Sequence, residues 1–343
     1  MSHPALYTAP GSITRWLALL GSMRIAALRE YCKRSYEIQQ EKYKTIKHHE
    51  LWKHLDTVDA WRHLRMYQRL DPLLQLFPHS VWVTIGDGRF GNDAHYLESK
   101  GVTVTATDLS ANLLEAAQRE GYIQRFQQEN AEALSFADDS FDFALCKEAY
   151  HHFPRPWLAV YEMLRVARLG VVLIEPNDTP ILHRPSRIAK QTIKYALLKL
   201  GLGKRFESQS LSIIDSGSDT HEAMGNYVYC LSQREIEKVA GGLGLPVVAF
   251  SGVNDHYVEG GESEPLAAAG PIYQQIRKEI RQQDRQSSRR LSRGRFRNIV
   301  AVLLKTNIDA SQEETLTSAG YRVYRLPSNP FASNEEPKPR LAA

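Results

Sequence analysis

The chain has 343 residues, of which 43% are hydrophobic, enough to bury a substantial core. Its formal net charge of +4 and its pI near 8.8 are too mild to indicate a nucleic-acid or membrane partner by themselves. The three cysteines, Cys32, Cys146 and Cys230, are widely spaced and form no C-x-x-C pair. This spacing argues against a disulfide framework or a zinc site. We therefore expect a cytoplasmic protein without a metal.

The sequence has no stretch that reaches the roughly 18 consecutive apolar residues of a membrane-spanning helix. Residues 16–20 resemble the core of a signal peptide, but Arg24 follows soon after and no small-residue cleavage site is evident. We interpret this segment as a helix that packs on the body of the protein. Peripheral contact with a membrane surface stays open as an alternative.

Helical character dominates the first part of the chain. Residues 1–55 are rich in Lys, Arg, Tyr and His, and residues 56–77 continue as an amphipathic helix. The pattern changes at residues 81–85, a short β-branched run that ends in a glycine cluster, as a buried strand and its turn do. We therefore predict an N-terminal helical extension over residues 1–77, followed by a second domain over residues 78–325.

Strands and helices alternate in this second domain. The sequence predicts helices at 91–100, 110–120 and 154–167, and strands at 102–107, 141–146 and 171–174. Residues 176–230 interrupt the alternation and are interpreted as an insertion. The pattern resumes with a helix at 231–242, a strand at 246–251, a long polar helix at 266–290 and a strand at 298–304. This alternation predicts an α/β fold with a mostly parallel sheet and helices on both faces. Residues 326–343 form a tail that we expect to be disordered at its end.

A glycine-rich loop, GDGRFG at residues 86–91, follows the first strand and opens a helix. Glycines allow a tight turn and the close approach of a ligand. The second strand ends at Asp108, 22 residues after Gly86, where an acid can accept both ribose hydroxyls of an adenosine. The ordered combination of strand, loop, helix, strand and acid predicts a site for an adenosine-type cofactor.

Charge favours one cofactor over another at this loop. A nicotinamide dinucleotide would place its pyrophosphate over Asp87, which would repel it. S-adenosylmethionine has no phosphate and carries an ammonium and a sulfonium, which a carboxylate attracts. At about 4–6 Å and an effective dielectric near 20, this difference in sign amounts to a few kcal/mol. The long side chain of Arg89 partly offsets the argument.

The chain resembles the class I S-adenosylmethionine-dependent methyltransferases, of the type 11 kind, over about residues 80–176. Several segments match this family in the same order: the glycine loop, Asp108-Leu109, Asn130-Ala131-Glu132, the DSFD run at 139–142, the EAYHHF run at 148–153 and Arg165-Val166. The resemblance implies a Rossmann-like, seven-stranded sheet. It also implies that a nucleophile of the acceptor attacks the methyl group of the cofactor directly, while the protein aligns the two partners.

The resemblance implies which residues contact the cofactor. The glycine loop and the end of the fourth strand would line its methionine part, the acid would bind its ribose, and the segment after Asn130 would flank its adenine. These residues are Gly86, Asp87, Gly88, Cys146, Lys147, Asp108, Leu109, Asn130 and Ala131. The chain departs from the family at Thr84, where an acid is usual, at Arg89 and Phe90, where small residues or glycine are usual, and after Gly170.

Three residues are candidates for catalysis. His151 and His152 follow the fourth strand, at the carboxyl edge where ligands bind in such sheets, and either could act as a base. Asp178 lies beyond the fifth strand, near Glu175 and Asn177, and could orient or deprotonate an acceptor. The alternative is that these residues shape the wall of the site. A base is needed only if the acceptor has a proton to lose.

Other functions remain open on the sequence. A nicotinamide-dependent oxidoreductase fits the glycine loop, and a non-catalytic S-adenosylmethionine-binding protein fits the departures from the family. The arginine run at residues 281–297 could bind RNA or an anionic lipid, but it has one aromatic residue and no nucleic-acid module, so a solvated helix end is favoured. For the acceptor we expect a small molecule, a glycan or a lipid-type compound.

Overall fold

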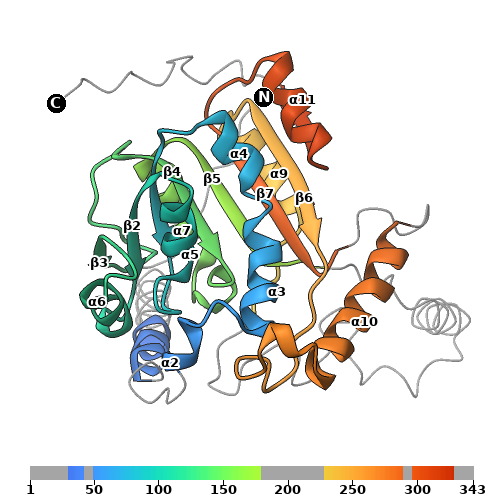
Figure 1. The fold of residues 1–343 in the computed structure, drawn as a ribbon. Helices are drawn as coiled ribbons and strands as arrows, with labels where there is room; N and C mark the ends of the chain where they lie inside the picture. The colour runs from blue at the N-terminus through green and yellow to red at the C-terminus, as the bar shows by residue number, and fades with distance from the viewer. Residues whose placement is uncertain (1–29, 42–48, 179–227, 289–295, 328–343) are drawn as a thin grey trace, which may run out of the picture.

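The computed structural model describes residues 30–41, 49–178, 228–288 and 296–327. Its centre is one sheet of eight strands in the order β3-β2-β1-β4-β5-β7-β6-β8 (Figure 1). In chain order these strands are β1 (Val81–Ile85), β2 (Thr103–Asp108), β3 (Phe126–Gln128), β4 (Phe141–Lys147), β5 (Ala167–Pro176), β6 (Val247–Val253), β7 (Asn298–Leu304) and β8 (Arg322–Arg325). The segment at 16–20, most of the insertion and tail, and part of the arginine run lie outside the described residues.

The predicted mostly parallel sheet is confirmed. Strands β3, β2, β1, β4 and β5 pair in parallel, whereas β7 runs antiparallel to both of its neighbours, β5 and β6. An eighth strand, β8, pairs antiparallel with β6 and exceeds the seven strands expected. With only four residues and arginines at both ends, β8 is too short for its sequence to have indicated a strand.

Helices cover both faces of the sheet, and each face has its own buried core. One core joins α3, α4, α5, α6 and α11 to side chains such as Trp82, Phe143 and Val302, and the other joins α7 and α9 to Val83 and Leu173. Alternate residues of each strand thus enter opposite cores. The helices are α2 (His49–Trp52), α3 (Val58–Tyr67), α4 (Asp71–Leu76), α5 (Asn92–Ser99), α6 (Asn112–Arg119), α7 (Pro156–Val166), α9 (Gln233–Gly242), α10 (Pro271–Ser287) and α11 (Ala310–Ser318).

Two predicted helices differ in extent from those observed. The amphipathic segment 56–77 forms two helices, α3 and α4, because Pro72 stands in the first turn of α4, where proline begins a helix and does not continue one. The long polar helix predicted at 266–290 begins at Pro271, and a short 3-10 turn over Leu266–Ala268 precedes it. Residues 30–41 form a further helix, which we call the N-terminal helix.

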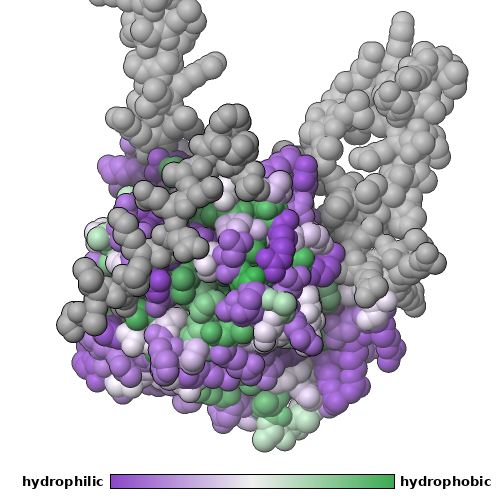
Figure 2. Space-filling model, turned by 90° about the horizontal axis from the view of Figure 1, so that it is seen from above, coloured by the Kyte–Doolittle hydropathy of each residue, from purple (hydrophilic) through white to green (hydrophobic). Residues whose placement is uncertain are grey.

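The described surface is mixed in character. On the face shown in Figure 2, hydrophobic residues gather near the middle and hydrophilic residues surround them. None of the helices within the described ranges combines the length and the apolar character needed to cross a bilayer. Strands β1, β2 and β4 are parallel neighbours, so their carboxyl ends lie beside one another at one edge of the sheet. Ligands bind at this edge in sheets of this kind, and the predicted site residues are located there.

Candidate cofactor and active site

The glycine loop turns sharply at the end of β1. Gly86 adopts a φ of +76°, and a Cβ atom built there would lie 2.4 Å from the Cβ of Ala149, so only glycine fits. Phe90 also has a positive φ, of 61°, although its ring is fully buried against Tyr122. The packing of this ring offsets the backbone strain, which explains how the chain tolerates phenylalanine at a position where glycine is usual.

The carboxylate of Asp87 is held by the protein itself. It accepts hydrogen bonds from the backbone N–H groups of Asp93 (3.1 Å) and Ala94 (2.9 Å) and from the Thr84 hydroxyl (2.9 Å). It therefore caps the first turn of α5, and Thr84 completes this arrangement in place of the usual acid. Burial and, next, the neighbouring Asp93 raise the pKa of Asp87 well above its ordinary value. The electrostatic argument for a cationic ligand is correspondingly weaker than the sequence implied.

Asp108 ends β2 beside this loop and is 5% exposed. Its carboxylate accepts hydrogen bonds from the backbone N–H of Ser110, at 2.8 Å, and from that of Gly88. Burial raises the pKa of Asp108 to about 6, against the opposing effect of these bonds. A buried carboxylate that lines a cavity and is held by two backbone donors is well suited to accept hydroxyl protons of a ligand.

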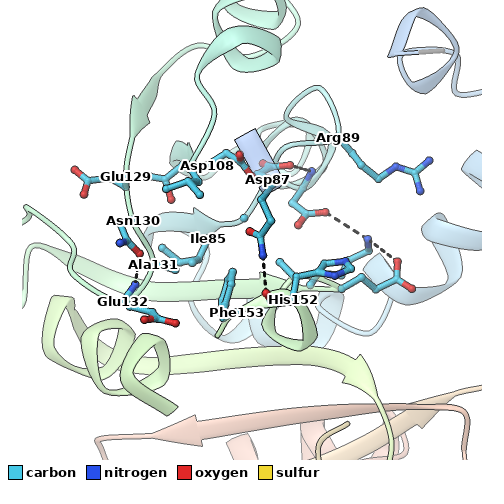
Figure 3. Close-up of a pocket in the computed structure, with 18 of the residues that line it drawn as sticks. Ile85, Asp87, Arg89, Asp108, Glu129, Asn130, Ala131, Glu132, His152 and Phe153 are labelled. Atoms are coloured by element: carbon cyan, nitrogen blue, oxygen red, sulfur yellow. Dashed lines mark hydrogen bonds and ion pairs between the residues drawn. The ribbon is translucent and has the colours of Figure 1, made fainter. Parts of the chain in front are cut away.

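One cavity brings most of the predicted cofactor residues together (Figure 3). Its wall includes Gly86, Asp87, Asp108, Leu109, Asn130, Ala131 and Lys147, together with His152. Gly88 does not line the cavity, but its backbone N–H donates a hydrogen bond to the Asp108 carboxylate. Cys146 does not line it either, since its fully buried thiol donates to Glu175 at 3.6 Å. Burial, followed by Glu175, raises the pKa of this thiol well above its ordinary value, which is unsuited to a thiolate nucleophile.

Charged side chains gather at the end of the cavity nearest β4. The Lys147 ammonium lies 3.3 Å from a Glu148 oxygen, 3.6 Å from an Asp93 oxygen and 4.9 Å from the centre of the Tyr67 ring. Burial would lower the pKa of Lys147, but Asp93 and Glu148 outweigh it and raise this pKa. Lys147 therefore stays cationic, as a fixed positive charge beside the glycine loop.

Arg89 points away from the other labelled residues of the cavity, as Figure 3 shows. Its guanidinium stacks 5.0 Å from the centre of the Trp52 ring, pairs with Asp59 and donates to Nε2 of His63 at 2.7 Å. The positively charged side chain of Arg89 thus contacts residues of α3. The sequence left open which way this side chain pointed, because the contacts come from a helix 30 residues upstream.

His151 lies beside a buried carboxylate at the ends of β4 and β5. Nδ1 of His151 is 2.8 Å from Oε2 of Glu175, a residue with no solvent exposure. The other oxygen of Glu175 accepts the backbone N–H groups of Ala149 and Tyr150 at 2.9 and 3.0 Å. These bonds fix the position of the carboxylate, which in turn orients the imidazole and favours a proton on Nδ1.

The three catalytic candidates occupy different positions. His152 lines the cavity, and its ring lies 4.0 Å from that of His151, which does not line it. Asp178 is exposed and lies outside the cavity wall, and its backbone N–H donates to Leu231. Burial and Glu235 raise the pKa of Asp178. Within the described residues, the structure groups His151 with Glu175 and leaves Asp178 apart from both.

The N-terminal helix supplies residues that the sequence did not single out. The Tyr36 hydroxyl donates to Glu132 at 2.6 Å, and the Gln39 and Gln40 amides donate to the carbonyls of His152 (2.6 Å) and Leu109 (3.3 Å). Tyr36 and Gln39 also line the cavity, together with Trp52. No local motif marks these residues, because their partners lie about 70 to 110 positions away along the chain.

The mostly parallel sheet, the glycine loop after β1 and the buried acid after β2 define a Rossmann-like cofactor-binding domain. Residues 83–174 match a protein-family model described as a methyltransferase domain. Residues 83–174 therefore match a type 11 methyltransferase domain.

Two relatives resemble parts of the chain. An uncharacterized protein of Mycobacterium tuberculosis is 36% identical over 84 residues, which cover 23% of this chain and 31% of that protein. The uncharacterized methyltransferase YcgJ of Bacillus subtilis is 52% identical over 44 residues, or 13% of this chain and 17% of its own length. The chain thus spans less than a third of the length of these relatives.

Solved structures resemble the chain more broadly but at low identity. The crystal structure of YcgJ matches 70% of this chain and 99% of its own, with 18% identity and a TM-score of 0.40. The magnesium protoporphyrin IX methyltransferase of Synechocystis, solved with bound SAH, matches 71% of this chain and 85% of its own, with 13% identity and a TM-score of 0.38.

Proposed function

We propose that the protein is an S-adenosylmethionine-dependent methyltransferase that acts on a small-molecule, glycan or lipid-type acceptor. The observation that carries this proposal is the cavity at the ends of β1, β2 and β4, whose wall lies mainly within the methyltransferase domain. Its glycine turn against Ala149 and its buried Asp108 suit an adenosine-containing ligand.

Each part of the cavity suits one part of the cofactor. Asp108 accepts hydrogen bonds from the ribose hydroxyls, and Gly88 holds its carboxylate in place. Leu109, Asn130 and Ala131 flank the adenine. Gly86, Asp87 and Lys147 line the methionine part, where the positive charge of Lys147 attracts a carboxylate. Cys146 supports this wall from behind, through its bond to Glu175.

When bound, the cofactor supplies an activated methyl group, and the protein aligns the acceptor for direct displacement and excludes water. We assign the base for an acceptor hydroxyl to the pair of His151 and His152: His152 lines the cavity, and its ring lies 4.0 Å from the ring of His151. Glu175 is a positioning residue in this scheme, since it orients the ring of His151 through Nδ1. Asp178, outside the cavity wall, orients the acceptor from the outer edge of the site.

Calorimetry with S-adenosylhomocysteine and with NAD tests the proposal. We expect S-adenosylhomocysteine to bind and NAD not to bind at the same concentrations. Binding of NAD without binding of S-adenosylhomocysteine would overturn the methyltransferase function in favour of an oxidoreductase. Radiolabelled methyl transfer to acceptors of the three classes then distinguishes an enzyme from a protein that only binds the cofactor.

A further inference from the structure

The methionine part of S-adenosylmethionine carries two opposite charges, a carboxylate and an ammonium group, on one carbon atom. In the proposed function the carboxylate has a partner, the cationic side chain of Lys147, but the ammonium group has none. Enclosing a cation without an anionic partner is unfavourable. Among the described residues of the cavity wall, six carboxylates could supply that partner: Asp87, Asp93, Asp108, Glu129, Glu132 and Glu148.

Four of these carboxylates, all labelled in Figure 3, already have partners in the protein. Glu129 and Glu132 each accept hydrogen bonds on both oxygens, from side chains and backbone N–H groups. Asp87 also accepts on both oxygens, since it caps the first turn of α5. Asp108 accepts from two backbone N–H groups and is assigned to the ribose. These carboxylates are therefore less available to an ammonium group than the two that remain.

The remaining two, Asp93 and Glu148, both contact Lys147 but differ in charge and exposure. The oxygen of Asp93 that lies near Lys147 also accepts the Tyr67 hydroxyl at 2.7 Å, and the Asp93 side chain is only 6% exposed. Burial raises the pKa of Asp93, which favours its neutral form. Burial would also raise the pKa of Glu148, but Lys147 and two nearby arginines outweigh it and lower this pKa. Glu148 is therefore the better anion of the pair.

One oxygen of Glu148 is anchored and the other is available. Oε2 lies 3.3 Å from the Lys147 ammonium and 3.3 Å from Nδ1 of His63. Oε1 has no hydrogen-bond partner among the described residues, and it is not one of their enclosed polar atoms that lack a partner. Because Glu148 lines the cavity, this oxygen can accept a hydrogen bond from a bound ligand.

The backbone of Glu148 also sets this residue apart. Its φ of 52° lies in the left-handed region, which costs free energy for any residue other than glycine. Its backbone N–H donates to the carbonyl of Ile174 in β5 at 2.9 Å, which helps to hold this conformation. Strained residues of this kind cluster at ligand sites, where the strain fixes the direction of a side chain. The conformation thus supports a role for the Glu148 carboxylate in binding.

We propose that Glu148 binds the ammonium group of the methionine part of the cofactor through Oε1. This inference rests on the proposed function and adds a residue to it. Lys147 and Glu148 then present one cation and one anion, 3.3 Å apart, to the two opposite charges of the amino-acid group. Adjacent residues at the end of β4 thereby recognise the zwitterion, and the Asp87 carboxylate stays with α5.

Two ligands that differ only in the ammonium group test this proposal. They are S-adenosylhomocysteine and its deamino analogue, in which a hydrogen atom replaces that group. We expect the full-length protein to bind S-adenosylhomocysteine about 10–30-fold more tightly than the analogue in calorimetry, because only the former makes a charge-assisted hydrogen bond to Glu148. In E148Q this preference should fall to within about threefold, while the affinity for the analogue stays close to that of the wild type.

A control and a second variant accompany E148Q. E115Q removes the charge of an exposed glutamate on α6, outside the cavity wall, and should keep the preference of the wild type. E148G removes the carboxylate with a residue that suits the positive φ, so it tests the same contact if E148Q does not fold. We expect E148G to lose the preference as E148Q does. Circular dichroism checks that each variant is folded.

The outcomes separate this proposal from the proposed function. Equal affinity of the wild type for the two ligands would overturn the role of Glu148, as would a preference that E148Q and E148G retain or that E115Q loses. In each of these cases S-adenosylhomocysteine still binds, and the cofactor assignment stands. Failure of S-adenosylhomocysteine to bind the wild type would instead overturn both proposals.

Discussion

Asp108 is an aspartate whose burial works against the stability of the fold. Its pKa in the folded protein is about 6, above the ordinary value of 3.8, so the folded state binds its proton more tightly than the unfolded state does. The carboxylate therefore destabilises the protein above pH 6, and this effect disappears as pH falls toward 4. Perturbed carboxyl groups of this kind cluster at functional sites, which supports the proposed role of Asp108 in binding the cofactor.

The substitution D108N should separate stability from binding. At pH 8 we expect the free energy of unfolding to rise by about 2 kcal/mol, since the variant has no charge to bury, and this gain should vanish near pH 4. Affinity for S-adenosylhomocysteine should fall about 10–100-fold. Urea denaturation at the two pH values and calorimetry measure the effects. D56N, at an exposed aspartate, is the control. A loss of stability in D108N at pH 8 would contradict this account.

Glu175 should control the ionisation of His151. A buried carboxylate 2.8 Å from Nδ1 stabilises the imidazolium, so E175Q should lower the pKa of His151. NMR titration of the histidine ring carbons measures this shift without a known acceptor. E162Q removes a carboxylate that pairs with Arg165 in α7 and should leave His151 unchanged. An unaltered His151 titration in E175Q would show that the carboxylate does not position the ring for proton transfer.

At the level of single residues, the sequence predicted which residues line the cavity better than it predicted where their side chains point. The positions of Gly86, Asp108 and Asn130 in the cavity wall follow from the order of strands and turns, which the sequence displays. The direction of Asp87 toward the first turn of α5, and that of Arg89 toward α3, depend on tertiary contacts. Local patterns carry no information on such contacts.

The N-terminal helix closes one side of the cofactor cavity through three side-chain hydrogen bonds. Glu132, which accepts from Tyr36, also accepts from the backbone N–H and Nε of Arg155, so it ties this helix to the start of α7. The helix therefore has its contacts on the wall that we assign to the adenine. The sequence predicted helical character over residues 1–55 but gave no sign of which helix would meet the cavity.

Removing these contacts should speed the release of the cofactor. For the double variant Y36F/Q39A we expect dissociation of S-adenosylhomocysteine to become about 5–10-fold faster, because the Tyr36 bond to the Glu132 carboxylate and the Gln39 bond to a backbone carbonyl each contribute on the order of 1 kcal/mol. Stopped-flow fluorescence measures the rate. K33A, on the exposed side of the same helix, keeps both contacts and is the matched control. Equal release rates in all three proteins would show that the helix does not retain the cofactor.

On the scale of the whole molecule, the sheet and its two buried cores join the described helices and strands into one folded unit. The boundary that we predicted at residue 77 stays a prediction about domains, but the buried core crosses it. Met66 and Leu70, from the N-terminal extension, lie in one buried cluster. The same cluster contains Trp82 of β1 and Leu316 of α11. Stability should therefore be shared across the predicted boundary.

A substitution in the extension tests this shared stability. L70A truncates a fully buried side chain and should lower the free energy of unfolding by about 2–5 kcal/mol, in a single transition. Far-ultraviolet circular dichroism and tryptophan fluorescence should report the same midpoint. L64A, at a residue that is 42% exposed on α3, should cost much less. Two separate transitions in L70A would mean that the extension unfolds as an independent unit.

The alternation of strands and helices predicted the parallel core of the sheet, but not its two ends. Strand β3 has three residues and β8 has four, too few for a period of two to stand out. Their pairing comes from neighbours distant in sequence: β8 lies beside β6, about 75 residues upstream. The sequence therefore gives the centre of such a sheet and leaves its width undetermined.

These short outer strands also bear on how the protein behaves when it is crowded. The outermost strand of an open sheet offers unpaired backbone groups to other chains. Here β8 begins and ends with an exposed arginine, Arg322 and Arg325, and β3 ends in two exposed glutamines, Gln127 and Gln128. Brevity at both margins, together with the arginine charges of β8, discourages edge-to-edge joining of copies. The architecture thus protects an extended sheet from aggregation at the places where growth by strand addition would begin.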